Sequence, residues 1–320
     1  MTYTADTLII GGGPAGLTAA IALARQQQTS IIFDSGTYRN DPADFMHLIP
    51  GFDHVKPSDF RSQAMQNLLA NYPAQISIQR TTVLQVQKDA SSGEITVTDH
   101  EDKTWNAKKL VLANGVEDIF PGIDGYAECW GTGIFHCLFC KGFEERGCTS
   151  AGVLAIGGLS KVPMALHVAR QAAAISDKVT IYTNGAEEVA KDVSAGFGPT
   201  AVMMVDARRI VHLEKLPTKA AVRLVFEDGS EKVEGFLAHT PQTKPRGPFV
   251  EQLGLEQTPS ADIKTSPPFF ETSVKGVFAA GDSCGMMKNV PNAVFSGSLA
   301  GMGASFQITA ECLGQKPLFG

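Results

Sequence analysis

Two cysteines, Cys137 and Cys140, are the residues whose type and spacing most directly indicate chemistry in this chain. A C-x-x-C pair can close an intramolecular disulfide and exchange it with another dithiol. At the start of a helix, the first sulfur would lie near free backbone N–H groups, which lower the pKa of a thiol and favour the thiolate. Lys141 adds a positive charge beside the pair, and His136 before it is a candidate base. We therefore expect a redox-active pair at a helix start.

Two other interpretations of the pair stay open on the sequence alone. A zinc ion could be bound by Cys137, Cys140, Cys129 and His136, although structural zinc sites usually show two such knuckles. The pair could also be plain buried thiols. The cysteines outside the pair are expected to be inert small apolar residues: Cys129, Cys148, Cys284 and Cys312.

A glycine motif near the N-terminus indicates a second kind of chemistry. Gly11, Gly13 and Gly16 satisfy G-x-G-x-x-G between an apolar strand expected at 7–10 and a helix expected at 17–25. The first glycine allows the tight turn, the second lets the backbone approach a pyrophosphate, and the third lets helix and strand pack closely. The helix N-terminus offers free N–H groups to the phosphates. The motif predicts a site for FAD or NAD and does not choose between them.

Asp34 completes this unit, because it follows a second apolar strand expected at 30–33. An acid about 20 residues after the glycines accepts a hydrogen bond from the adenosine ribose. A similar strand–glycine–helix unit begins near residue 152, with Gly157 and Gly158 after its strand. Further strands are expected at 76–78, 82–86, 94–98, 109–112, 179–182, 209–213 and 222–226, and helices at 58–70, 164–174 and 292–313.

The composition limits the class of protein. A length of 320 residues suits about two domains, and 43% hydrophobic with 19% charged residues is typical of a globular protein. A net charge of −6 provides no basic patch, which argues against a nucleic-acid partner. No secretory leader and no apolar run of about 18 residues is evident. We expect a soluble, cytoplasmic protein without a membrane partner.

Three motifs together resemble the low-molecular-weight thioredoxin reductase family: GGGPAG at 11–16, the central C-x-x-C, and GVFAAGD at 276–282. The resemblance covers essentially the whole chain. It implies an α/β fold of two Rossmann-like three-layer domains. The FAD-binding domain would comprise residues 1–115 and 240–320. A smaller central domain, residues 116–239, would interrupt it and carry the cysteines on a degenerate NAD(P)H-binding fold.

The same resemblance assigns roles to single residues. Cys137 would exchange with the outside substrate, Cys140 would face the flavin, and Asp282 would hold the flavin's ribitol. It also implies a homodimer. The expected contacts with FAD are Gly11, Gly13, Pro14, Ala15, Gly16, Asp34, Ser35, Arg39, Asn40, His47, Val83, Ala113, Asn114, Gly115, Gly281, Asp282, Asn289 and Val290.

The second glycine loop departs from the reductases. It reads Gly-Gly-Leu-Ser at 157–160, and the following strand ends without an arginine for the 2′-phosphate of NADPH; Lys161 could compensate. The stretches 126–140, 142–147 and 180–185 resemble the fungal dithiol oxidases of gliotoxin-type pathways. That resemblance implies oxidation of a small-molecule dithiol, of the diketopiperazine type, to a disulfide. O2 would re-oxidise the flavin and yield H2O2.

Lys141 is a further departure, because the family usually has an aspartate acid/base after the second cysteine. A lysine, with an ordinary pKa of about 10.4, is a poor proton acceptor. His136, His47 and Glu144 are the candidates to replace it, and Leu48 stands where relatives often have asparagine. Two other functions stay open: an NADPH-dependent reductase of a thioredoxin-like protein, and a flavin redox sensor without turnover.

Overall fold

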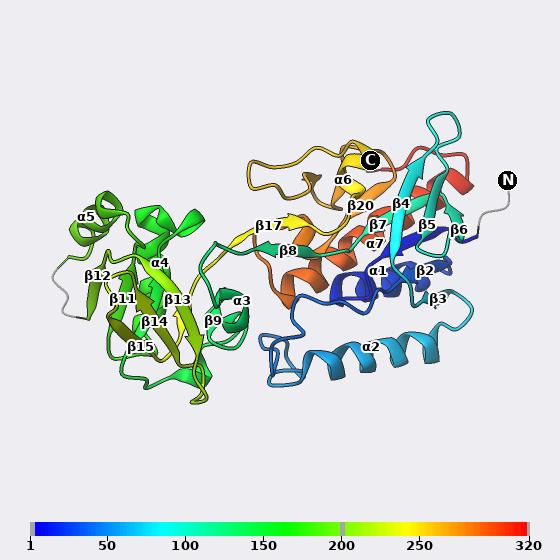
Figure 1. Cartoon of the computed structure of the whole chain (residues 1–320). Coiled ribbons are helices and arrows are strands. Elements are labelled where there is room, and N and C mark those ends of the chain that lie inside the picture. The colour runs from blue at the N-terminus through cyan, green and yellow to red at the C-terminus, as the bar shows by residue number, and fades with distance from the viewer. Residues whose placement is uncertain (1–3, 199–201, 319–320) are drawn as a thin grey trace. The chain divides into compact units, whose positions relative to one another are not determined.

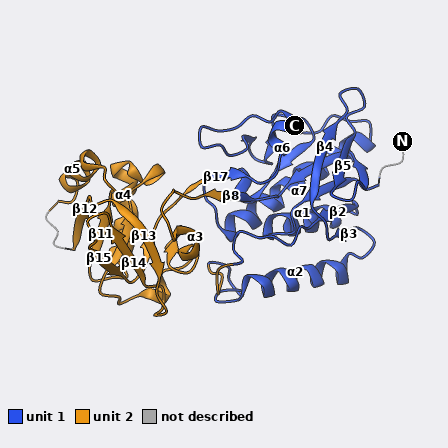
Figure 2. Ribbon diagram, viewed as in Figure 1, with its two compact units in different colours: residues 1–41, 48–117, 243–320 blue, residues 42–47, 118–242 orange. Residues whose placement is uncertain are grey.

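The computed structural model describes residues 4–198 and 202–318, which form two compact units (Figure 2). Unit 1 comprises Met1–Asp41, Leu48–Glu117 and Thr243–Gly320. Unit 2 comprises Pro42–His47 and Asp118–Gln242. Each unit is built around its own parallel sheet.

The sheet of unit 1 has the order β18-β19-β20-β7-β1-β2-β3, with parallel pairing from β20 to β3. Its strands are β1 (Thr7–Ile10), β2 (Ser30–Phe33), β3 (Ile76–Gln79), β7 (Lys109–Leu112), β18 (Thr265–Ser266), β19 (Glu271–Thr272) and β20 (Val277–Ala279). All residues of β1, β2 and β7 are buried. Short, mostly apolar runs such as β1 are typical of strands that are covered on both faces.

Side chains alternate between two layers on either side of this sheet. Leu8 and Ile10 pack under the antiparallel strands β4 (Val83–Lys88), β5 (Ile95–Asp99) and β6 (Thr104–Ala107). Ile9 packs on the opposite face, among the helices. Figure 1 shows this three-layer arrangement, which follows from the two-residue period of a strand. Helix α6 (Phe249–Leu253) lies with β4, and α2 (Pro57–Asn71) lies with α1 and β3.

Helices α1 (Pro14–Ala24) and α7 (Val290–Cys312) pack unusually closely in the helical layer. A Cβ atom on Gly297 would overlap the carbonyl oxygen of Ala15, and one on Gly301 would lie 2.5 Å from that of Ala19. Helix α7 begins two residues before the expected start, because the Asn289 side chain caps it by accepting from the Asn292 N–H (2.9 Å).

Unit 2 repeats the three-layer plan around a parallel sheet of order β12-β11-β10-β16-β9. Its strands are β9 (Ile134–Phe135), β10 (Ala151–Leu154), β11 (Val179–Tyr182), β12 (Met203–Asp206) and β16 (Leu237–Ala238). One face packs on α4 (Val162–Ala173) and α5 (Glu187–Ala195), and the other on β13 (Ile210–Lys215), β14 (Val222–Phe226), β15 (Glu231–Glu234) and α3 (Tyr126–Cys129). The α/β fold class expected from the sequence is confirmed.

The chain passes between the units at 117/118 and 242/243, compared with the expected 115/116 and 239/240. The crossings lie in β8 (Val116–Ile119) and β17 (Gln242–Pro245), which pair as a two-stranded sheet. The segment 42–47 is a correction, because the sequence placed it in the FAD domain and it belongs to unit 2. Asp44 and His47 of this segment contact Lys141 and Glu144 of unit 2, which a residue-by-residue pattern does not reveal.

Among the described residues, no helix combines the length and the apolar character that crossing a membrane requires.

Replacing Gly297 by alanine tests the close contact of α1 and α7. The new methyl group would overlap the Ala15 backbone, so we expect a loss of about 1–3 kcal/mol in stability, measured by thermal and denaturant unfolding. Gly122→Ala is the matched control, because a Cβ there meets no atom within 4 Å. An unchanged melting temperature for Gly297→Ala would contradict this packing.

Candidate functional site

Cys137 and Cys140 are joined by a disulfide in unit 2, with 5.2 Å between their Cα atoms. Both residues are half-buried, and the Cys140 N–H donates to the Cys137 sulfur (3.1 Å). Such a bond to sulfur stabilises a thiolate when the pair is reduced. The bonded sulfurs do not fit the interpretation of the pair as plain buried thiols.

Cys129, the third sulfur of the zinc interpretation, is also an unsuitable ligand. Cys129 is fully buried in a hydrophobic cluster, and burial raises the pKa of its thiol to about 11. A zinc ligand must be a thiolate. Among the remaining cysteines, Cys148 and Cys284 are half-buried, whereas Cys312 is exposed at the end of α7.

No helix starts at the cysteine pair, which corrects the sequence expectation. The Lys141 N–H donates to the Cys137 carbonyl (3.0 Å) and closes a single turn. A short 3-10 helix, η1 (Phe143–Glu145), follows. The break comes at Gly142, where a Cβ would lie 2.6 Å from the Leu138 carbonyl oxygen. The Cys137 sulfur therefore accepts a hydrogen bond from a single backbone N–H, that of Cys140, and does not lie at a helix N-terminus.

His136 lies beside the disulfide in the chain, and its ring faces Trp130 at a centroid distance of 5.9 Å. Its carbonyl accepts from the Thr240 hydroxyl (3.4 Å). Phe139, between the two cysteines, and Phe143 are exposed. The disulfide thus has apolar neighbours on the surface of unit 2.

The ammonium of Lys141 is bound by the carboxylate of Asp44, 3.1 Å away. The same ammonium lies 5.3 Å from the centre of the Phe135 ring, a cation–π distance. Lys141 lines a cavity of about 360 Å³ in unit 2, and this size lies in the range of small-molecule sites. We call it the Lys141 pocket; its other lining residues include Asp44, His47, Thr132, Glu144 and Lys219.

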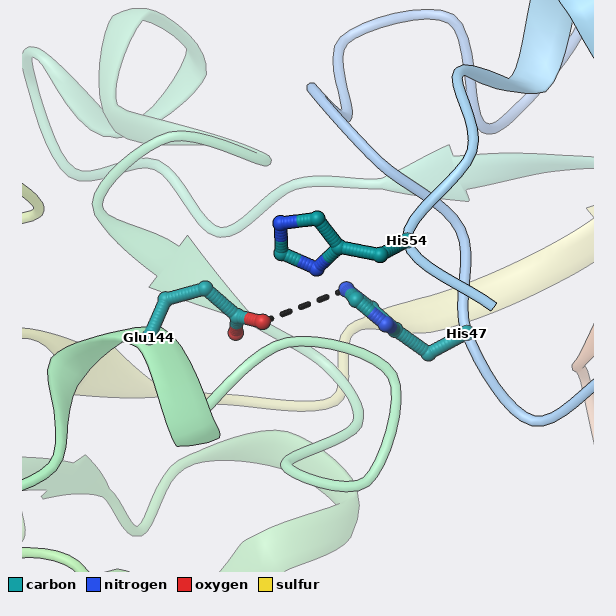
Figure 3. A group of neighbouring side chains, drawn as sticks. All are labelled: His47, His54 and Glu144. Carbon is teal, nitrogen blue, oxygen red and sulfur yellow. Dashed lines mark ion pairs between the residues drawn. The ribbon is translucent and has the colours of Figure 1, made fainter. Parts of the chain in front are cut away.

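A histidine–carboxylate pair lines the same pocket. His47 Nε2 lies 3.2 Å from Glu144 Oε1, and Figure 3 shows the two side chains facing each other. The second oxygen, Oε2, accepts the Gly142 N–H (3.2 Å), which fixes the carboxylate close to the cysteine turn. The sequence assigned His47 to FAD, whereas the structure pairs it with Glu144 in unit 2. Figure 3 also draws His54, which belongs to unit 1.

The glycine loop of unit 1 fits a pyrophosphate. A Cβ on Gly11 would overlap the Ala113 carbonyl, and one on Gly16 would overlap the carbonyl of Gly11. Gly13 is different, because a Cβ there would meet no protein atom within 4 Å. Pro14 begins α1 directly after it. Gly11 and Gly16 thus serve the fold, while Gly13 leaves open space where a phosphate would approach.

Asp34 lies buried at the carboxyl end of β2, and protein groups surround its carboxylate. Oδ1 accepts from the Tyr38 hydroxyl (2.8 Å) and the Gly36 N–H (3.0 Å), and Oδ2 binds the Arg80 guanidinium. Tyr38 and Arg80 lie in irregular segments and were not found by sequence reasoning. The bond from Asp34 to the adenosine ribose stays a prediction.

The C-terminal motif meets the glycine loop at the carboxyl edge of the same sheet. Gly281 follows β20 with φ 77°, and a Cβ there would lie 3.0 Å from that of Ala15. Asp282 pairs with Arg39 at 3.1 Å. Asn114, after β7, has a buried Oδ1 without a partner among the described groups. An open sheet binds its ligand at this edge, and a buried acceptor without a partner suits a flavin N–H.

The remaining expected FAD contacts are not all brought to this edge. Asn289 is the cap of α7, directly before Val290. Val83 is buried in the core between the two sheets. Asn40 accepts from Arg61 (3.2 Å), and Ser35 is exposed. Gly115 follows Asn114 with φ 67° and accepts the Arg246 N–H through its carbonyl (3.0 Å).

The second glycine loop forms a 3-10 turn, η2 (Gly157–Ser160), ahead of α4. Two arginines do lie beside the end of β11, but they come from the segment after the neighbouring strand: Arg208 and Arg209 follow β12, whose Asp206 pairs with Tyr182. The guanidinium of Arg208 binds Asp206 at 2.5 Å and lies 3.9 Å from the Phe226 ring centre. Arg208 is therefore engaged by protein groups.

Comparison with known proteins agrees with this geometry. Residues 5–297 match the family described as pyridine nucleotide-disulphide oxidoreductase. Thioredoxin reductase tcpT of Claviceps purpurea (strain 20.1) is 50% identical over 315 residues, which are 98% of this chain and 97% of that protein. Thioredoxin reductase sirT of Leptosphaeria maculans is 42% identical over 316 residues, which are 97% of this chain and 94% of that protein. The crystal structure of an oxidoreductase from Agrobacterium tumefaciens superposes with a TM-score of 0.82 at 29% identity, covering 97% of this chain and 99% of that one.

Replacing Gly13 by alanine separates cofactor binding from folding. The methyl group meets no protein atom, so we expect an unchanged melting temperature of the apoprotein and a strongly reduced content of FAD, measured by the flavin absorbance per protein. Gly158→Ala, in the open second loop, is the control and should keep its FAD. A Gly13→Ala protein that retains full FAD would contradict the assignment of this loop.

Proposed function

The chain belongs to the pyridine nucleotide-disulphide oxidoreductase family, and we propose that within this family it acts as a dithiol oxidase. Proteins of this family carry FAD, and the chain is an FAD-binding disulfide oxidoreductase. In our proposal, the Cys137–Cys140 disulfide oxidises a small-molecule dithiol, of the diketopiperazine type, to a disulfide. O2 is the final acceptor, and H2O2 is released.

The observation that carries the proposal is the state of the second nucleotide loop. A reductase of this kind needs NADPH, whose 2′-phosphate is bound by arginine. Strand β11 ends at Tyr182 and is followed by no arginine of its own, the nearby Arg208 is bound by Asp206, and the glycine loop forms a 3-10 turn before α4. The Lys141 pocket adds support, because its volume of about 360 Å³ suits a small molecule.

The exchange chemistry follows from the cysteines. A thiolate of the substrate attacks the Cys137 sulfur, the Cys137–Cys140 bond breaks, and Cys140 leaves as a thiolate. The second substrate thiol then attacks the mixed disulfide, which releases the substrate disulfide and the Cys137 thiolate. The Cys140 N–H stabilises that thiolate. FAD, when bound, would supply a two-electron acceptor for the reduced cysteine pair that O2 can re-oxidise.

An NADPH-dependent disulfide reductase is the second candidate. It is favoured by the names of the relatives, which are thioredoxin reductases in Claviceps purpurea and Leptosphaeria maculans. A flavin redox sensor without turnover is the third.

Anaerobic reduction of the flavin distinguishes the three. The purified holoprotein is mixed with NADPH or with dithiothreitol, the flavin absorbance is followed, and O2 is then admitted. We expect bleaching by the dithiol, recovery on O2 entry, and H2O2 equal to the dithiol consumed. Cys137→Ser and Cys140→Ser should abolish bleaching by the dithiol. Bleaching by NADPH alone would support the reductase instead, and bleaching by neither would support the sensor.

A further inference from the structure

The exchange reaction requires a proton acceptor that the cysteine turn does not contain. Each substrate thiol must lose its proton before its sulfur attacks. Lys141, next to Cys140, holds its ammonium 3.1 Å from Asp44, and an ammonium only donates. Asp44 is engaged by this ion pair. The base must therefore come from another element of unit 2.

The Lys141 pocket contains one arrangement suited to this task. His47 Nε2 lies 3.2 Å from Glu144 Oε1, and the two side chains are 12% and 25% exposed. The Gly142 N–H holds the other carboxylate oxygen at 3.2 Å, so the pair is fixed relative to the turn that carries the cysteines. A carboxylate that orients an imidazole also stabilises the imidazolium formed when the ring accepts a proton.

Other acid–base groups near the turn are less suited. The ring of His136 faces Trp130 and does not line the pocket. Glu145 lines the pocket but is buried. His239 is also buried, bonded to Tyr126, and burial lowers its pKa to about 4, so it is a weak base.

The charges of the pocket indicate the class of substrate. Lys141, Lys215 and Lys219 line it together with the carboxylates Asp44, Glu144 and Glu145. Because both signs are present, the pocket does not select an anion or a cation. An uncharged molecule that carries hydrogen-bond donors and acceptors, such as amide groups, matches this lining.

We propose that the Lys141 pocket binds an uncharged alkyl dithiol with amide groups, and that the His47–Glu144 pair accepts the proton of the attacking thiol. This inference rests on the proposed oxidase function. The thiol S–H bond breaks, its proton moves to the His47 imidazole, and its electron pair forms the new bond to the Cys137 sulfur. The Cys137–Cys140 disulfide is the oxidant, and Glu144 pairs with the resulting imidazolium.

The test compares two dithiol probes that differ in acidity. Anaerobic stopped-flow measurements follow flavin reduction of the holoprotein by dithiothreitol, an alkyl dithiol, and by an aromatic dithiol that is ionised at neutral pH. We expect Glu144→Gln and His47→Gln to slow reduction by dithiothreitol about 100-fold, a usual contribution of a general base. Reduction by the aromatic dithiol should stay within a few-fold of wild type, because that probe needs no base.

Two variants complete the design. Glu188→Gln is the matched control, since Glu188 is exposed and pairs with Lys191 on α5; it should behave as wild type with both probes. The double variant of Glu144 and His47 should be no slower with dithiothreitol than the slower single variant, because the two residues act as one unit. FAD content and melting temperature show which variants are folded, and either single variant suffices for the comparison of probes.

The outcomes separate this inference from the proposed function. Equal slowing of both probes would mean a structural role and would overturn the inference, as would no slowing with either. In both cases a wild-type protein that is bleached by dithiothreitol keeps the oxidase proposal. A wild-type protein that no dithiol bleaches would overturn both.

Discussion

Unit 1 depends on direct backbone-to-backbone contacts, which are possible because glycines lie where two elements meet. Gly11 lies against the Ala113 carbonyl, and Gly297 and Gly301 let α7 lie directly on α1. These contacts bring the glycine loop after β1, the end of β7 and the Gly-Asp turn after β20 to one edge of the sheet. Close packing at glycines thus brings the chemical groups of that edge together.

The helices and strands were predictable because burial imposes a recognisable pattern of apolar residues on their sequences. Strands at 7–10, 30–33 and 179–182 lie where their short, mostly apolar runs predicted, since both faces of a parallel strand are covered. The Gly11–Gly16 loop was recognisable for a related reason, as its spacing is imposed by one ligand shape. The α7 start was missed by two residues, because a cap depends on one side chain, Asn289, and not on a repeat.

The parts of the site that could not be predicted are set by single long-range contacts. The segment 42–47 carries no period, and its place in unit 2 rests on pairs such as Lys141–Asp44 and His47–Glu144. The cysteine turn was expected to open a helix, but the backbone of Gly142, with φ 176° and ψ −40°, is not helical and ends it after one turn. Lys141, which departs from the family pattern, forms an ion pair with Asp44, and this pair gives the lysine a structural role.

The order of the strands also constrains how the protein is made. Unit 1 is discontinuous in the chain, and its β20 and α7 lie beyond unit 2, which is synthesised in between. On the ribosome, unit 2 can form its own sheet while β1, β2 and β7 still lack the strand and the helix that close their core. Apolar surface on α1 stays uncovered until the last segment emerges. The edge of the sheet where the cofactor is expected is therefore complete only after the last segment has folded onto unit 1.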